Sequence, residues 1–171
     1  PLLNRATQGL YQPGAALQTV VVAEALRQGI IEELTVAVEP GWNEDVLVDG
    51  VRVGCSAVPQ GAATLASAYA AGCPAPVGVL GDRLGSDGVA EAVERWRLTV
   101  PPPLAIPTEA SDWSRAAGSS SQDEAFGQGS LTVTPLQMSL VAATVANGGT
   151  MPDPRLALRV DDSQANWQAA R

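Results

Sequence analysis

The fold of this chain is decided by the stretch Phe126-Gly127-Gln128-Gly129-Ser130-Leu131-Thr132-Val133-Thr134-Pro135-Leu136-Gln137-Met138. Its glycines predict a turn, and Thr134 can cap a helix that follows. Pro135 suits the first helical turn, and Gln137, three residues after the threonine, completes a capping box. We therefore predict a helix that begins after Thr134 and ends at Asn147-Gly148-Gly149.

Two elements near the N-terminus follow from equally local signals. Pro13-Gly14 opens a predicted helix over 15–28, which has an apolar face and stops at Gly29. Residues 46–48 and 51–53 flank an Asp-Gly pair, which supplies the positive φ angles of a two-residue turn. These residues predict a β-hairpin.

The rest of the chain divides at glycine and proline. We predict helices over 62–71, over 76–84, and from residue 86 or 87 to about 97, with the first two separated at 72–74. The remaining predictions are an irregular excursion over 99–124, a short strand over 156–160, and a final short helix in the polar tail 161–171.

Composition limits the functions that the chain can have. All ten positive charges among its 171 residues are arginines, because the sequence contains neither lysine nor histidine. Lysine and histidine are common general bases, whereas arginine stays protonated. The net charge of -8, with no basic cluster, argues against nucleic acid as a partner. No apolar run reaches the roughly 18 residues that spanning a bilayer requires, so we expect no membrane segment in this chain.

Cys55 and Cys73 are the only cysteines. Two cysteines do not define a disulfide framework, and without histidine a zinc site would need other ligands, so we expect neither a metal nor another cofactor. The pair forms either one disulfide or two buried thiols. Neighbouring carboxylates such as Asp123-Glu124 are typical of solvated surfaces, and an enzyme that uses them or Cys73 is therefore the weakest functional alternative.

Two segments, in this order, resemble the transpeptidase domain of penicillin-binding proteins. The first is Asn4-Arg5-Ala6-Thr7-Gln8-Gly9-Leu10-Tyr11-Gln12-Pro13-Gly14, and the second is 126–138, followed by Ala146-Asn147-Gly148-Gly149-Thr150. The resemblance to this penicillin-binding and serine β-lactamase-like family is partial and degenerate. It identifies 1–160 as a partial transpeptidase-like domain and leaves 161–171 as a C-terminal tail.

The catalytic motifs that the resemblance implies are altered. The family's first motif, S-x-x-K, supplies a serine nucleophile and a lysine that activates it, but Ala15 and Gln18 stand at these positions. The second motif, S-x-N, aligns with Gly72-Cys73-Pro74, which lacks both the hydroxyl and the amide. The third motif, K-T-G, lies on a strand after the end of this sequence, which contains no lysine. We therefore expect no catalytic residue at the degenerate positions Ala15, Gln18, Gly72 and Pro74.

The resemblance also implies an architecture. It predicts an α+β fold that is mainly α, namely the helical part of a transpeptidase domain with a small β-hairpin and most of the five-stranded sheet missing. The chain is then either a fragment or a shrunken domain. Apolar surface left by the missing sheet favours either strands supplied by another chain or packing against a partner copy, so a homodimer is a hypothesis. Some family members carry a cysteine at the position of Cys73 and another near the hairpin, so the resemblance favours a disulfide between Cys55 and Cys73.

From the resemblance we expect a catalytically inactive, pseudo-transpeptidase domain in the cell envelope, outside the cytoplasm. Its role would be structural or the binding of other proteins, with cell-envelope proteins or peptidoglycan as partners. The alternative is a noncovalent binder of peptidoglycan stem peptides in a vestigial cleft.

Overall fold

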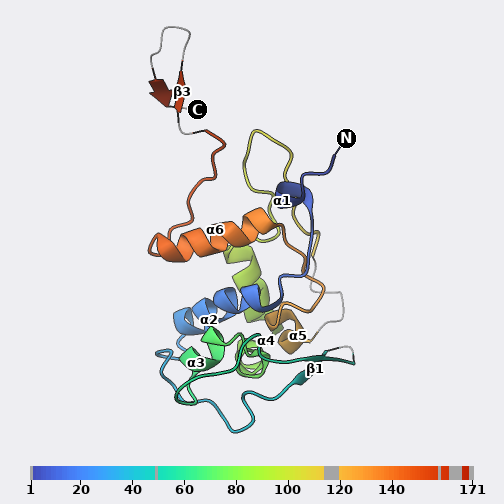
Figure 1. Cartoon of the computed structure of the whole chain (residues 1–171), viewed down its shortest axis with the longest axis vertical. Helices are drawn as coiled ribbons and strands as arrows, with labels where there is room; N and C mark the ends of the chain where they lie inside the picture. The colour runs from blue at the N-terminus through green and yellow to red at the C-terminus, as the bar shows by residue number, and fades with distance from the viewer. Residues whose placement is uncertain (1, 49, 114–119, 158, 162–166, 170–171) are drawn as a thin grey trace.

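The computed structural model describes residues 2–48, 50–113, 120–157, 159–161 and 167–169. Its elements are, in chain order, α1 (Arg5–Gln8), the 3-10 helix η1 (Gly14–Leu17), α2 (Gln18–Arg27), β1 (Val46–Val48), β2 (Val51–Val53), α3 (Leu65–Ala70), α4 (Pro74–Arg95), α5 (Ser121–Ala125), α6 (Pro135–Ala146), β3 (Arg159–Asp161) and β4 (Trp167–Ala169). In the view of Figure 1, α2 lies between α6 and the group of α3, α5 and β1. The predicted fold class is confirmed, because the chain is mainly helical and its described strands form two separate two-stranded sheets.

The core forms around α2. Its buried side chains pack against α4, and small aliphatic residues supply most of this contact; the members from η1 and α2 are Leu17, Val20, Val21, Val22 and Ala25. The helix predicted over 15–28 is confirmed, although its first turn is the 3-10 helix η1. Gly29, at φ 70°, follows the end of the helix as predicted, since a left-handed residue here suits glycine.

Helix α4 contains the break that separates two predicted helices. Gly85 has φ 67° and ψ 173°, which is not helical, so helical conformation stops after Leu84 and resumes at Ser86. The helix begins at Pro74, two residues earlier than predicted, because proline fits the first turn and needs no hydrogen bond for a backbone N–H. Helix α3 is shorter than predicted, since the Thr64 side chain caps it and accepts from Ser67 N.

The prediction of an irregular segment over 99–124 is wrong at the end of that segment, where α5 forms. Ser120 caps this helix by accepting a hydrogen bond from Asp123 N at 3.0 Å. Helix α5 packs closely on α4, because a Cβ at Gly81 would lie 2.6 Å from Cβ of Ala125 and 2.7 Å from the Ser121 carbonyl oxygen. Only glycine permits this approach, and the five-residue helix is held by packing rather than by its own propensity.

Helix α6 is capped as its sequence predicts, and the cap also binds the segment that follows α4. Thr134 and Gln137 form the predicted capping box. The Gln137 side chain, 2% exposed, accepts from Thr134 N at 2.9 Å and donates to the Leu98 carbonyl at 2.7 Å. A single buried amide therefore joins the start of α6 to the segment that follows α4.

The predicted β-hairpin is confirmed. Strand β1 pairs antiparallel with β2, with Val46 opposite Val53 and Val48 opposite Val51. Gly50, in the turn, has φ 78°, and Asp49 lies outside the described residues.

The second hairpin corrects the prediction for the C-terminal tail. The strand predicted over 156–160 forms later, at β3, which pairs antiparallel with β4. The short helix expected over 161–171 is wrong where the tail is described, while 162–166 and 170–171 lie outside the described residues. A short helix without a packed face is marginal in water, whereas strand pairing gives the backbone hydrogen-bonding partners. The β3–β4 pair stands apart from the helical body (Figure 1).

One buried carboxylate joins α2 to α4. Glu24 is 1% exposed and accepts hydrogen bonds from the Arg27 guanidinium, at 2.6 to 3.0 Å, and from Gln28 Nε2, at 2.9 Å. Arg95 Nε lies 3.5 Å from the same carboxylate. The hydrogen bond from Arg27 holds the pKa of Glu24 below its usual value, Gln28 and the charge of Arg95 act in the same direction, and burial opposes them.

Candidate functional site

Two of the degenerate motif positions, Ala15 and Gly72, lie close together. Ala15 lies on η1 and is exposed, whereas Gly72 immediately precedes Cys73 and the start of α4. A Cβ built on Gly72 would lie 3.8 Å from Cβ of Ala15. Gln18 begins α2 one turn after Ala15, and Pro74 begins α4. The structure therefore brings Ala15, on η1, close to Gly72, in the segment that precedes α4.

The space for a side chain at position 72 is already occupied. Gly72 has φ 63°, and a Cβ there would lie 2.9 Å from Oγ of Ser56 and 3.1 Å from its Cβ. Ala57 N donates to the Ala71 carbonyl at 3.0 Å, which fixes the segment beside the glycine. A serine at this position would therefore require both a strained backbone and a shift of Ser56.

Ser56 was not found from the sequence. Its hydroxyl lies 2.9 Å from the place that a Cβ on Gly72 would take, yet nothing local in the sequence distinguishes it from other exposed serines. The one sequence feature that could have pointed to Ser56 is its position directly after Cys55. A disulfide between Cys55 and Cys73 places the residue after Cys55 close to Gly72.

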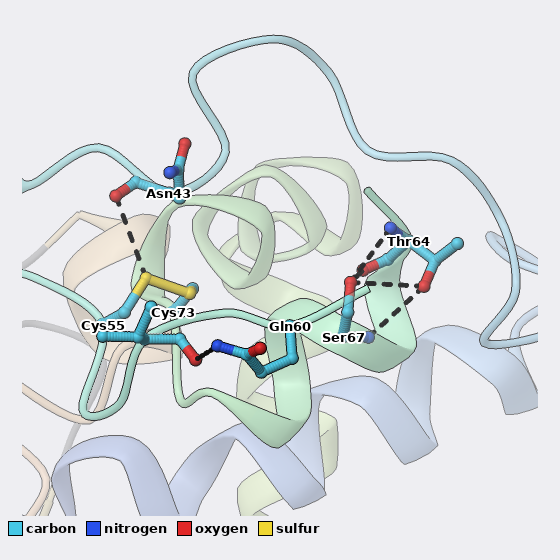
Figure 2. Close-up of a disulfide and its surroundings, with 7 residues drawn as sticks. Asn43, Cys55, Gln60, Thr64, Ser67 and Cys73 are labelled. Atoms are coloured by element: carbon cyan, nitrogen blue, oxygen red, sulfur yellow. Dashed lines mark hydrogen bonds between the residues drawn. A yellow bond between two sulfur atoms is a disulfide. The ribbon is translucent and has the colours of Figure 1, made fainter. Parts of the chain in front are cut away.

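Cys55 and Cys73 form that disulfide, with an S–S distance of 2.05 Å, as the resemblance implies (Figure 2). Cys73 is fully buried and precedes the first residue of α4, and its backbone N donates to the Ala68 carbonyl at 2.9 Å. The Asn43 carbonyl oxygen lies 3.9 Å from Sγ of Cys55. The bridge therefore anchors the chain that follows the β1–β2 hairpin to the start of α4.

Neither remaining position offers a group for proton transfer. Gln18 is 2% exposed, so its neutral amide lies in the core rather than in an open cleft. Pro74 is buried and has no backbone N–H to donate to a substrate. A primary amide is far too weak a base to deprotonate a hydroxyl, and arginine, the only basic side chain in the sequence, stays protonated.

The two sequence segments that carry the resemblance contact each other. Tyr11 and Val133 exchange backbone hydrogen bonds, with Tyr11 N to Val133 O at 2.9 Å and Val133 N to Tyr11 O at 2.8 Å. Gly14 N donates to the Gly127 carbonyl at 2.9 Å, and Gln12 Nε2 donates to the carbonyls of 128 and 129, at 3.1 and 2.9 Å. These bonds hold the turn that precedes η1.

Glu124 binds the glycine turn of the second of these two segments. The side chain is 7% exposed, so the expectation that Asp123-Glu124 forms a solvated face is wrong for its second member. Its Oε1 accepts from Ser130 N at 2.9 Å, from Ser130 Oγ at 2.8 Å and from Trp113 Nε1 at 3.2 Å. These bonds order the glycine turn between α5 and α6, because a buried carboxylate stays paired.

The described part of the chain gathers no three histidine, cysteine, aspartate or glutamate side chains in a geometry that could hold a metal ion. None of the helices in that part is long and apolar enough to cross a bilayer. In the run of three serines at 119–121, Ser120 caps α5 and Ser121 is the first residue of that helix, while Ser119 lies outside the described residues.

Comparisons with known proteins identify relatives of this chain. The family described as the penicillin binding protein transpeptidase domain matches residues 1–170. Peptidoglycan D,D-transpeptidase PbpA of Mycolicibacterium smegmatis is 31% identical over 91% of the chain and 33% of its own length. Peptidoglycan D,D-transpeptidase MrdA of Acinetobacter baumannii is 24% identical over 91% of the chain and 25% of its own length. The chain thus spans a third or less of these relatives.

Solved structures show the same fold. The D,D-transpeptidase domain of a peptidoglycan glycosyltransferase from Eggerthella lenta superposes with a TM-score of 0.78, at 21% identity, over 99% of this chain and 45% of its own. Penicillin-binding protein A of M. tuberculosis, in an imipenem acyl-enzyme complex, gives a TM-score of 0.76 at 24% identity, over 99% of this chain and 40% of its own. With the family match over nearly its whole length, the chain belongs to the penicillin-binding-protein transpeptidase domain family.

Proposed function

We propose that this chain is a catalytically inactive transpeptidase-like domain. The proposal rests on two neighbouring residues, Ala15 on η1 and Gly72 just before α4. Ala15, which has no nucleophilic atom, stands where the motif requires serine, and it faces Gly72, which has no side chain. Covalent catalysis needs a nucleophile and a group that activates it, and both are missing from these positions.

The nearby hydroxyl of Ser56 does not restore the chemistry. A serine becomes an effective nucleophile when a base within hydrogen-bonding distance takes its proton. The sequence holds no histidine or lysine, and Gln18, at the position of the motif lysine, is neutral and buried. Ser56 therefore fills space beside Gly72 in our proposal and does not form an acyl-enzyme.

The proposed role is structural, or the binding of other proteins, in the context of peptidoglycan synthesis. The names of the relatives support the peptidoglycan context, since both are peptidoglycan D,D-transpeptidases. The disulfide supports an extracytoplasmic, cell-envelope location, because disulfides persist mainly in oxidising compartments. The retained parts of the domain support a scaffold, since the contacts of the turn before η1 and the cap of α6 are intact.

Association with a second copy belongs to the same proposal. Several apolar side chains of and near the first hairpin are exposed, with Leu47 at 67%, Val51 at 64% and Val58 at 79%. A homodimer through this face would remove apolar surface from water. Light scattering tests it directly, because a monomeric mass over a range of concentrations would contradict it.

Labelling with a fluorescent penicillin, followed by denaturing electrophoresis, tests the proposed inactivity. The polypeptide should be used in its natural length, so that any motif outside these 171 residues is present, with the M. smegmatis PbpA as the labelled control. We expect no covalent band. A serine-dependent band would show that the alignment of Ala15 and Gln18 with the catalytic motif is wrong. Calorimetric titration with muropeptides separately tests the alternative that the chain binds stem peptides noncovalently. A measurable heat of binding would support that alternative.

A further inference from the structure

A groove runs between α4 and the segment that links α2 to the first hairpin. Its volume is about 330 Å³, within the range of small ligand pockets. Most of the lining is apolar, including Ile31, Val36, Val38, Trp42, Leu65 and Val79. Val36 and Val79 are 41% and 44% exposed, so the apolar surface reaches the outside of the molecule. We call this surface the α4 groove.

One wall of the α4 groove is a short piece of strand with a free edge. Ala37 forms an antiparallel bridge with Thr64, in which Val38 N donates to the Ala63 carbonyl and Leu65 N donates to the Val36 carbonyl. In this pattern Ala37 and Thr64 are a non-hydrogen-bonded pair, so the N–H and C=O of Ala37 point away from Thr64. No hydrogen bond among the described residues uses these two groups, and Ala37 lines the groove.

The wall is held in place before anything binds. Ala66 N donates to the Leu34 carbonyl at 2.7 Å, in addition to the two bonds that flank Ala37. Trp42 packs against the cluster of Ala68, Ala71 and Cys73, which contains the disulfide. Because the free edge is fixed, a peptide could pair with it at little cost in ordering the protein.

The opposite wall presents a cation. Arg83 lies one helical turn after Val79 on α4, lines the groove and is exposed. It forms no ion pair with any carboxylate in the described part of the chain. Glu39 also lines the groove, so the two charged members of the lining are one cation and one carboxylate.

We propose that the α4 groove binds an extended segment of a partner protein that carries a large apolar side chain next to an acidic residue. The segment adds as a strand to the edge at Ala37, the mode of recognition in which main-chain bonds give affinity and side-chain pockets give specificity. Its apolar side chain enters the groove, and its carboxylate pairs with Arg83, whose guanidinium forms two parallel bonds with such a group. This surface is separate from Ala15 and Gly72, so the inference does not depend on the catalytic state of the domain.

Selection from a phage-displayed library of random heptapeptides tests the proposal, because it samples apolar and acidic residues at every position of an extended segment. We expect enriched peptides that share an apolar residue beside aspartate or glutamate. Arg83→Gln and Val79→Asp should each lower the affinity for a selected peptide by about tenfold or more. The first variant removes the charge-assisted contact with the peptide carboxylate, and the second removes an apolar contact with the peptide side chain in the groove. The matched controls Arg52→Gln, on β2, and Val145→Asp, on α6, change exposed residues of the same types outside the groove and should bind like the unmodified protein.

Two further measurements separate the parts of the inference. Methylation of the backbone nitrogens of a selected peptide should abolish binding, since it removes the donor that strand pairing requires. Glu39→Gln should preserve or strengthen binding, because it removes a like charge. The inference would be overturned by a library that yields no binder, by binders that lack a carboxylate, or by binding that the Arg83 and Val79 variants weaken no more than their controls do.

Discussion

The amide of Gln137 offers a sharp test of how this fold is held together. Truncation by Gln137→Ala leaves the buried Thr134 N–H and the Leu98 carbonyl without the partners that lie at 2.9 and 2.7 Å. A buried polar group that loses its partner costs about 1 to 3 kcal/mol, so the two together cost about 2 to 6 kcal/mol. The bonds of Nε2 to the carbonyls of 97 and 100 are 3.4 Å long and add little.

Urea unfolding, followed by tryptophan fluorescence and far-ultraviolet circular dichroism, measures this loss. Gln122→Ala is the matched control, because Gln122 is exposed and its amide donates to Asp82 at the surface. We expect the control to change the free energy of unfolding by about 0.5 kcal/mol. Equal losses of unfolding free energy in the two variants would refute the reasoning, because burial would then not affect how much the amide contributes to stability.

Gln137→Glu sharpens the same test. The variant keeps an acceptor for Thr134 N but turns a carboxylate oxygen toward the Leu98 carbonyl, where Gln137 places a donor. A carboxylate is acceptor-only when ionised and gains a donor when protonated. Relative to the unmodified protein, the variant should therefore be least stable near neutral pH and recover part of its stability in acid. A loss that does not change with pH would contradict this geometry.

Three further predictions concern other parts of the fold. Replacing Cys55 and Cys73 by serine removes a bridge between residues 18 apart, and urea unfolding should show a loss of about 3 kcal/mol. Gly81→Val places a side chain where Cβ of Ala125 is only 2.6 Å away, and calorimetry should show a lowered Tm from a loss of about 1 to 3 kcal/mol. Because the folded pKa of Glu24 is depressed, its contribution is complete above the ordinary value of 4.5 and is lost as pH falls through the folded pKa. The stability difference between the unmodified protein and Glu24→Gln should therefore shrink below about pH 4.5, and a constant difference would contradict that assignment.

The elements that the sequence predicts well are those whose signals are local. The capping box at Thr134 and Gln137 and the Asp-Gly turn of the first hairpin depend on neighbouring residues, and both form as predicted. The break at Gly85 also needs only the residue itself. For these elements, backbone preference and hydrogen bonding over a few residues are sufficient.

The elements that the sequence does not predict depend on contacts between distant residues. Helix α5 forms where α4 presents Gly81, and a five-residue segment without apolar periodicity gives no sign of that contact. Ser56 lies beside Gly72 because the disulfide brings the two segments together. Glu124 looks like a surface carboxylate in the sequence, and its burial follows from the turn at Ser130 that it binds. Such residues become visible only when the chain is folded.

Intact mass measurement after incubation with penicillin tests the proposed inactivity most directly. It should use the polypeptide in its natural length, both unmodified and with Ala15→Ser and Gln18→Lys combined. We expect both masses to remain unchanged, because Gly72 and Pro74 still lack the hydroxyl and the amide of the second motif. A penicilloyl adduct on the unmodified protein, mapped to Ser56 or to any other serine, would contradict the proposal that this transpeptidase domain is inactive.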